Sequence, residues 1–369
     1  MSSPQGRTGT ILGQTQSPDG KMWYVKQNPR EELTDIEFRI YRAAREVLGI
    51  RVPEVLRCDN PTILMVEDAG TSLENMLHTS QELMQKREEF TQFLTQNIAV
   101  RSELNKIIQG TLTITDQQFL LEYNSERLLR SMKQWVPEDT IITMQDIHTH
   151  FWAYRVMNAI GVYDESFKEA YTQLIGSKIE TLLPKYGSWL QDNCLRNNAS
   201  PDGKIVMPFD FNSLQYGLRQ MDETGMSGLY LFHGILGVFD SAEKRDGFIE
   251  ERAIQCGYEG YEEEEYREGY ILSVVHQQVL LAGYRTQEAK YLKRELQSQQ
   301  QELGGIKRGT VIAFRSAFDE IDYHQASCVQ AFRECSEVFI SKPEERKLLG
   351  NIDAFITHYT FGQRVGMMF

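Results

Sequence analysis

Short apolar runs separated by turn signals fill the first part of the chain and predict a small β-sheet. Thr8–Leu12 and Met22–Gln27 are strand-like, and the Ser-Pro-Asp-Gly segment at Ser17–Gly20 is typical of a tight turn, so the two runs predict a β-hairpin. The runs Val52–Leu56 and Ile63–Val66 predict two further strands. The pattern therefore favours an antiparallel sheet that ends before residue 70.

Between the hairpin and the later strands, apolar residues recur at helical spacing. Four of these residues share one helical face: Ile36, Ile40, Ala44 and Leu48. Gly49 is placed to end the helix. Two starts are open. A start at Asn28-Pro29 puts Glu37 in the middle of the helix, where it can face the sheet. Alternatively, Thr34–Glu37 forms a capping box in which Glu37 accepts from a backbone donor.

From residue 72 to residue 188 the pattern is helical and almost free of strand signals. It predicts four helical blocks, at about 80–108, 116–133, 144–160 and 164–184. Residues 226–369 favour helices again, including a glutamine-rich one near 285–303 that ends at Gly304-Gly305.

A second strand-and-turn stretch interrupts the helical pattern at residues 189–212. The turn signal Ser200–Gly203 lies between two apolar runs, Cys194-Leu195 and Ile205–Met207, and so predicts another hairpin. Its open end would bring residues just before and just after these runs together.

Composition places the chain among soluble globular proteins with a large core, because 41% of its 369 residues are hydrophobic and 25% are charged. No apolar run is long enough to span a membrane, and Met1–Gly13 lacks the apolar core of an export signal. We therefore expect a cytoplasmic protein that does not contact a membrane. The five cysteines are scattered, which favours reduced thiols.

The formal charge of −13 disfavours nucleic acid and anionic membranes as partners, because the long-range field of the protein repels phosphates. A neutral or cationic partner fits better. The acidic run at residues 262–265 is either a solvated segment or one wall of a site for a cationic molecule.

Three polar residues in the second strand-and-turn stretch carry the candidate chemistry. Asp192 precedes Asn197 by five positions, and Asp210 follows across the predicted hairpin. Phosphoryl transfer to a hydroxyl needs a carboxylate near the attacking oxygen and ligands for the metal that holds the triphosphate. The hairpin would place Asn197 and Asp210 side by side, where two oxygen ligands suit Mg²⁺.

With this spacing, Asp192, Asn197 and Asp210 resemble the catalytic loop and the metal-binding aspartate of the aminoglycoside phosphotransferase and choline kinase-like families. The resemblance implies that Asp192 orients or deprotonates the acceptor hydroxyl. It also implies that Asn197 binds one metal ion and that Asp210 bridges metal and phosphates.

Upstream, Lys26 at the end of a predicted strand and Glu37 in the following helix resemble the lysine and glutamate whose ion pair positions the ATP phosphates in these families. Glu31 or Glu32 is an alternative partner. The segment Leu64–Gly70 is similar to the connector between lobes, where backbone groups from Glu67 to Ala69 would bind adenine.

The resemblance covers roughly residues 9–225 and implies an α+β, two-lobed protein-kinase-like fold. An N-terminal nucleotide-binding lobe at 1–70 would carry the antiparallel sheet, and a helical C-terminal lobe at 71–369 would carry the catalytic loop at 189–212. The implied activity is ATP- and Mg²⁺-dependent transfer of the γ-phosphate to a small-molecule hydroxyl on a sugar, an aminoglycoside or an amino alcohol. No oligomeric state is implied.

The sequence departs from the family pattern at three places. Leu190 stands where these families usually have histidine, Asn212 stands where many kinases have glycine, and the expected phosphate-covering turn near Gly13–Ser17 is poor in glycine. Leu190 and the turn leave open a catalytically degenerate binding protein. A kinase acting on protein or RNA is a further alternative, although no Ala-Pro-Glu-like signal follows Asp210 and the charge is unsuited to RNA.

Overall fold

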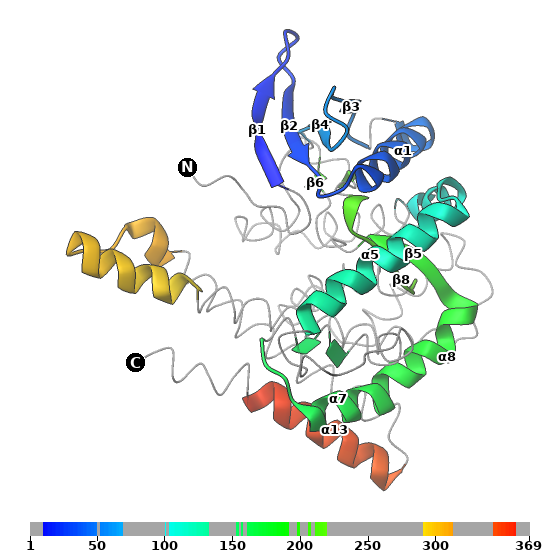
Figure 1. Cartoon of the computed structure of the whole chain (residues 1–369), viewed down its shortest axis with the longest axis vertical. Helices are drawn as coiled ribbons and strands as arrows, with labels where there is room; N and C mark the ends of the chain where they lie inside the picture. Colours follow the sequence, from blue (N-terminus) through cyan, green and yellow to red (C-terminus); the bar gives the residue numbers. More distant parts are fainter. Residues whose placement is uncertain are drawn as a thin grey trace, which may run out of the picture. The chain divides into compact units, whose positions relative to one another are not determined.

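The structure is a computed structural model, and Figure 1 labels its helices and strands. The chain divides into two compact units. Unit 1 is Met1–Glu122 with Gly187–Tyr261, and unit 2 is Tyr123–Tyr186 with Glu262–Phe369. The expected lobe boundary at residue 70 stays a prediction. The residues described are 10–49, 52–68, 100, 103–132, 153–154, 156–157, 161–191, 198–199, 206–207, 211–219, 291–312 and 342–358.

A four-stranded antiparallel sheet opens unit 1, with the strand order β1-β2-β4-β3. Its strands are β1 (Thr10–Gln16), β2 (Met22–Gln27), β3 (Val55–Arg57) and β4 (Ile63–Glu67). The predicted hairpin and the two later strands are confirmed, although β3 begins three residues later than expected. β1 runs further than expected, because it continues through Gln16 and so includes most of the segment predicted as a phosphate-covering turn.

The β1–β2 connection is a tight turn with glycine where the backbone requires it. The Gly20 N–H donates to the Ser17 carbonyl at 2.9 Å, and Gly20 has a φ of 87°. A three-residue hairpin loop with glycine in a left-handed conformation is one of the common connections between antiparallel strands.

Helix α1 (Glu31–Leu48) follows β2 and ends at Gly49, which has a φ of 61°. The predicted apolar face is confirmed, and all four of its residues are buried: Ile36, Ile40, Ala44 and Leu48. The helix starts at neither expected place. The Asn28 N–H donates to the Thr62 carbonyl at 2.9 Å and so extends the pairing of β2 with β4 beyond Gln27. The helix therefore begins only at Glu31.

Two short antiparallel pairs lie later in unit 1. β5 (Gly187–Gln191) pairs with β8 (Leu214–Leu218), and β6 (Asn198–Ala199) pairs with β7 (Val206–Met207). The 3₁₀ turn η3 (Phe211–Ser213) directly precedes β8.

The predicted second hairpin is therefore present, but its first strand is β6. The run Cys194-Leu195, which the sequence pattern assigns to that strand, lies outside the described residues. The sequence pattern does not predict the pairing of β5 with β8.

A helical segment at residues 103–111 belongs to unit 1. After two intervening residues comes α5 (Ile114–Met132), which begins in unit 1 and continues into unit 2 from Tyr123. The segment 103–111 and the residues beside it bury apolar side chains at four-residue spacing: Val100, Leu104, Ile108 and Leu112. These helices confirm the described parts of the predicted blocks at 80–108 and 116–133.

Unit 2 contains α7 (Glu165–Tyr171), the π-helical turn η2 (Thr172–Gly176) and α8 (Ser177–Tyr186), which confirm the block predicted at 164–184. The Asp164 side chain caps α7 by accepting from the Phe167 N–H at 2.8 Å. Helix α13 (Pro343–Ile356) packs on α7, where the rings of Phe167 and Phe355 stack with centroids 4.0 Å apart.

The other helical predictions are covered only in part. Residues 153–154 and 156–157 are helical, as the block at 144–160 requires. The glutamine-rich helix is present at 291–303 and ends at Gly304, which has a φ of 66°. No helix in the described ranges is long and apolar enough to cross a membrane.

Candidate functional site

A buried ion pair between the sheet and α1 forms the centre of the described part of the site. Lys26 Nζ of β2 lies 2.6 Å from Glu37 Oε1 of α1, and the two side chains are 7% and 0% exposed. Burying two charges costs several kcal/mol per ion in desolvation, so such a pair is weak evidence for stability and a candidate for function. Glu31 and Glu32, the alternative partners, are exposed.

Asn28 is a second buried partner of Glu37. Its Nδ2 donates to Glu37 Oε2 at 2.8 Å, so both carboxylate oxygens of Glu37 are bound. Sequence reasoning missed Asn28. Lys26 and Asn28 are two positions apart on an extended chain, which puts their side chains on one face, and this spacing would have been the signal.

Two contacts hold the segment after Asp210, one to α1 and one to Asn28, just beyond the end of β2. Phe211 is fully buried, and its ring meets Tyr41 edge-on with centroids 4.6 Å apart. Asn212 Nδ2 donates to Asn28 Oδ1 at 2.8 Å. Side chains of η3, α1 and the end of β2 thus come together in one buried cluster.

Glu67 closes β4, and its carboxylate is bound by neighbouring groups of the sheet and α1. The carboxylate lies 3.2 Å from Lys21 Nζ and 3.5 Å from Arg45 Nη1, and it accepts the Glu54 N–H at 2.9 Å. Together with Glu54 it raises the pKa of Lys21 above the usual value.

The backbone N–H groups at this end of β4 are also used. The Glu67 N–H donates to the Glu54 carbonyl, and the Asp68 N–H donates to the Met22 carbonyl. A nucleotide can therefore contact the Glu67 backbone only through its carbonyl oxygen. Ala69, the other expected adenine contact, lies outside the described residues.

Asp192, Asn197 and Asp210 also lie outside the described residues, but each adjoins a described element. Asp192 follows Gln191, which ends β5 and pairs with Leu214. Asn197 precedes Asn198, which pairs with Met207, and Asp210 precedes η3. Within the described part of the chain, no three His, Cys, Asp or Glu residues form a group that could hold a metal ion.

The β1–β2 turn carries a negative charge and uses its own donors. The Ser17 hydroxyl donates to the Asp19 carboxylate and thereby holds the pKa of Asp19 below the usual value. The Ser17 N–H donates to the Lys21 carbonyl at 2.9 Å. Such a turn differs from a glycine-rich anion cradle, whose N–H groups point outward.

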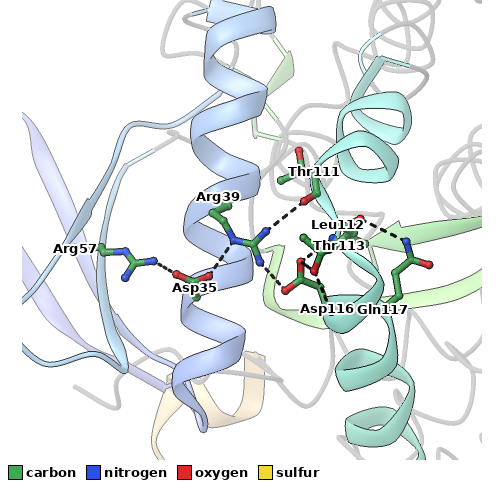
Figure 2. Close-up of polar contacts among 8 residues, drawn as sticks. All are labelled: Asp35, Arg39, Arg57, Thr111, Leu112, Thr113, Asp116 and Gln117. Carbon is green, nitrogen blue, oxygen red and sulfur yellow. Dashed lines mark hydrogen bonds and ion pairs between the residues drawn. The ribbon is translucent and has the colours of Figure 1, made fainter.

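A further polar cluster joins α1 to the start of α5 (Figure 2). Arg39 of α1 donates to Asp116 Oδ1 at 2.6 Å, to the Thr111 carbonyl at 3.2 Å and to Asp35 at 2.9 Å. Thr113 and Asp116 form a capping box on α5, since each side chain accepts the backbone N–H of the other, at 2.8 and 3.1 Å. Sequence reasoning missed this contact.

Comparisons with known proteins give distant structural neighbours alone. No family model and no curated protein matches the sequence. An aminoglycoside phosphotransferase from Alicyclobacillus acidocaldarius is 12% identical, with coverage of 89% of this chain and 93% of its own and a TM-score of 0.41.

Two further neighbours have TM-scores of 0.44 and identities of 11%. An ethanolamine kinase from Plasmodium vivax matches 94% of this chain and 83% of its own. An amicoumacin kinase in complex with AMP-PNP, Ca²⁺ and Ami matches 87% of this chain and 92% of its own. All three neighbours are named as kinases or phosphotransferases. Within the described ranges, the small antiparallel sheet followed by mainly helical segments agrees with the predicted protein-kinase-like fold.

The described residues have a defined chemical capacity. Lys26 offers a compact positive charge on a central strand, and Glu37 fixes its position from α1. A buried ammonium held in this way can bind an anionic oxygen at low reorganisation cost, as phosphate binding requires.

Proposed function

We propose that this protein is an ATP-dependent phosphotransferase that moves the γ-phosphate to a hydroxyl group of a small molecule. The observation that carries the proposal is the buried pair of Lys26 with Glu37, on the strand and the helix where the family resemblance expects it. A surface lysine and a helical glutamate with no joint function would not need to be desolvated together.

In this proposal, residues of β2, α1 and the connector that follows β4 bind the nucleotide. Lys26 contacts the phosphates and Glu37 keeps the ammonium in place. The carbonyl of Glu67 and the N–H of Ala69 contact adenine, since the Glu67 N–H is already bound to Glu54.

Asp192, Asn197 and Asp210 carry the transfer step. Asp192 orients or deprotonates the acceptor hydroxyl, while Asn197 and Asp210 hold Mg²⁺. Carboxylate and amide oxygens are the ligands that Mg²⁺ prefers, so this donor set fits the metal. Bound Mg²⁺ would neutralise the charge that develops on the phosphate oxygens. The pairing of β5 with β8 and of β6 with β7 supports the proposal, because each candidate adjoins a strand or η3.

The acceptor is proposed as a sugar, an aminoglycoside or an amino alcohol. The net charge of −13 favours a neutral or cationic molecule over an anionic one.

The β1–β2 turn favours a second candidate, a nucleotide-binding protein without catalysis. The segment Gly13–Ser17, where a phosphate-covering turn is expected, lies mostly in strand β1, and the Ser17 N–H is bound to the Lys21 carbonyl. That N–H is therefore not available to position a γ-phosphate for transfer. Nucleotide binding with no turnover on any acceptor would support this candidate.

A phosphorylation screen over metabolites and antibiotics tests the proposal. The screen compares wild type with the site variants Asp192→Ala and Asp210→Ala and with a control variant, Asp353→Ala, at an exposed position. We expect Asp192→Ala to keep nucleotide affinity and lose turnover, because Asp192 would contact the acceptor. Asp210→Ala should also lose Mg²⁺-dependent nucleotide binding, whereas Asp353→Ala should match wild type. Turnover that survives in both site variants would refute the mechanism.

A further inference from the structure

A buried chain of hydrogen bonds joins the Lys26–Glu37 pair to the segment that follows Asp210. Its links are 2.6 Å from Lys26 to Glu37, 2.8 Å from Asn28 to Glu37 and 2.8 Å from Asn212 to Asn28. All four residues are buried. The chain thus connects β2, α1 and η3 through side chains.

The charge of Glu37 fixes the direction of every link. An ionised carboxylate only accepts hydrogen bonds, so Asn28 must turn its Nδ2 toward Glu37. The Oδ1 of Asn28 then faces residue 212, which must donate. Asn212 meets this requirement with its own Nδ2, whereas an ionised aspartate has no donor and a glycine has no side chain.

Phe211 and Asn212 restrict η3 in different ways. The contact of Phe211 with Tyr41 holds η3 against α1 by apolar packing, which is not directional. The Asn212 hydrogen bond is directional and therefore sets the orientation of the turn. Since each residue has only two soft backbone dihedrals, orienting residues 211 and 212 fixes the direction in which the chain enters η3, directly after position 210.

We propose that Asn28 and Asn212 are positioning residues that hold the Asp210 segment in register with the Lys26–Glu37 pair. The inference rests on the proposed function, because it takes Asp210 as a metal ligand and Lys26 as a phosphate ligand. Neither asparagine touches the reacting atoms. Each acts by fixing a neighbour, so that the phosphate-binding and metal-binding sides of the site form together.

The donor–acceptor direction of the hydrogen bonds that link residues 37, 28 and 212 can be reversed by substitution. This reversal gives a test that needs neither nucleotide nor metal. Glu37→Gln and Asn212→Asp should each lower the folding equilibrium constant, the first by removing the counter-charge of Lys26 and the second by facing two acceptors toward each other. In the double variant, the amide introduced at position 37 can donate to Asn28, and Asn28 can donate to the carboxylate introduced at position 212. We expect the fold-decrease in the folding equilibrium constant of the double variant to be about tenfold smaller than the product of the fold-decreases of the two single variants.

We repeat the comparison of the two single variants and the double variant in a protein that carries Asn28→Ala. There the two substitutions should lower the folding equilibrium constant independently, because the residue that links positions 37 and 212 is absent. Single losses that simply multiply in the original background would overturn the hydrogen-bonded chain. Coupling that persists without Asn28 would also overturn it.

Titration with AMP-PNP, with and without Mg²⁺, tests positioning as distinct from stability. Asn28→Ala and Asn212→Ala should reduce the gain in affinity that Mg²⁺ provides by about tenfold or more, as the loss of residues that orient metal ligands commonly does. The matched control is Asn105→Ala, a buried asparagine in the helical segment 103–111.

Asn105→Ala should keep the Mg²⁺ gain whatever its stability. If Asn28→Ala and Asn212→Ala lose stability but keep the increase in AMP-PNP affinity that Mg²⁺ provides, the positioning role is overturned. A wild-type protein that binds no AMP-PNP would refute the proposed function and with it the positioning role. In that case, the nucleotide-free cycle would still decide whether the hydrogen-bonded chain exists.

Discussion

Lys26 and Glu37 illustrate how a pair of charges can be poor for stability and still occupy the interior. Replacing one member leaves the other charge buried without its partner, which typically costs about 3–5 kcal/mol. Replacing both by apolar residues of similar volume is often neutral or stabilising. Stability and nucleotide binding can therefore be separated at these two positions.

We expect Lys26→Met to lower the free energy of unfolding by about 3–5 kcal/mol and Lys26→Met/Glu37→Met to restore most of it. Both variants should lose AMP-PNP binding, because neither has a charge for the phosphates. Chemical denaturation and ligand titration measure the two effects. Lys21→Met, at partly exposed ion pairs, is the control and should change stability far less than Lys26→Met does. A double variant that binds nucleotide as wild type does would remove Lys26 from the site.

For these individual residues, the sequence indicated Lys26 and Glu37 through their order along the chain and their place on a strand and a helix. It did not distinguish Glu37 from Glu31 or Glu32, because the choice depends on where α1 begins. Asn28 was missed although its spacing from Lys26 was a usable local signal. Its further contact with Asn212, far away in sequence, leaves no local pattern.

Among the secondary-structure elements, α5 depends on the capping box of Thr113 and Asp116 for its start. Removing an N-cap side chain costs about 1 kcal/mol, so Thr113→Ala should lower the free energy of unfolding by about that amount. Amide hydrogen exchange should then rise in the first turn of α5. Thr115→Ala changes the same residue type two positions inside the helix and is the control. Equal effects of the two substitutions would contradict the cap.

The stabilisation by Asp116 should depend on pH. Burial raises the pKa of Asp116, but hydrogen bonds from Arg39 and Thr113 outweigh burial and hold this pKa below the usual value. A carboxyl group with a lowered pKa stabilises the fold above its unfolded-state pKa, about 3.9, and loses this effect as the pH falls through the folded-state pKa. The stability difference between wild type and Asp116→Asn should therefore be constant near neutral pH and shrink below about pH 4. A constant difference down to the acid transition would contradict the ion pair with Arg39.

Gly20 provides a test of the hairpin turn. Its φ of 87° disfavours any side chain, although an added Cβ would meet only Gln16 Nε2 at 4.0 Å. Gly20→Ala should therefore cost about 1 kcal/mol through backbone strain alone. Gly110→Ala is a control of opposite sign, because Gly110 is helical and alanine stabilises a helix by about 0.5–1 kcal/mol over glycine. Thermal unfolding of both variants measures this contrast, and a stabilised Gly20→Ala would contradict the turn geometry.

Elements with strong local signals were predicted well, and those that depend on distant pairing were not. The β1–β2 hairpin has a turn signal between two strand-like runs, and α1 has an apolar face and a terminal glycine. β5 and β8 have no turn signal between them, because they are far apart in sequence: Gly187 pairs with Leu218 across a long intervening segment. The pattern of Gly187–Gln191 is also mixed in polarity, so periodicity alone does not identify a strand there.

Across the chain as a whole, the described residues proposed to bind nucleotide, Lys26, Glu37 and Glu67, all belong to unit 1. The lobe boundary near residue 70 stays a prediction from the sequence. The two compact units each draw on separate stretches of the chain, and this division was not predicted. Such an interleaved arrangement depends on long-range contacts, and neither hydrophobic periodicity nor composition reports these.

Phe355 of α13 offers a way to weaken unit 2 without changing a proposed nucleotide contact. Its ring stacks on Phe167 of α7, and both side chains are buried. Phe355→Ala should cost about 3–5 kcal/mol, since it removes a core ring and leaves a cavity. We expect hydrogen exchange to rise in α7 and α13, while the affinity for AMP-PNP stays within about twofold of wild type, because sites without shared partners usually act independently. The matched substitution Tyr41→Ala removes a buried ring in unit 1 that contacts Phe211, and it should weaken AMP-PNP binding. Equal losses of affinity in the two variants would mean that unit 2 is needed to form the nucleotide site.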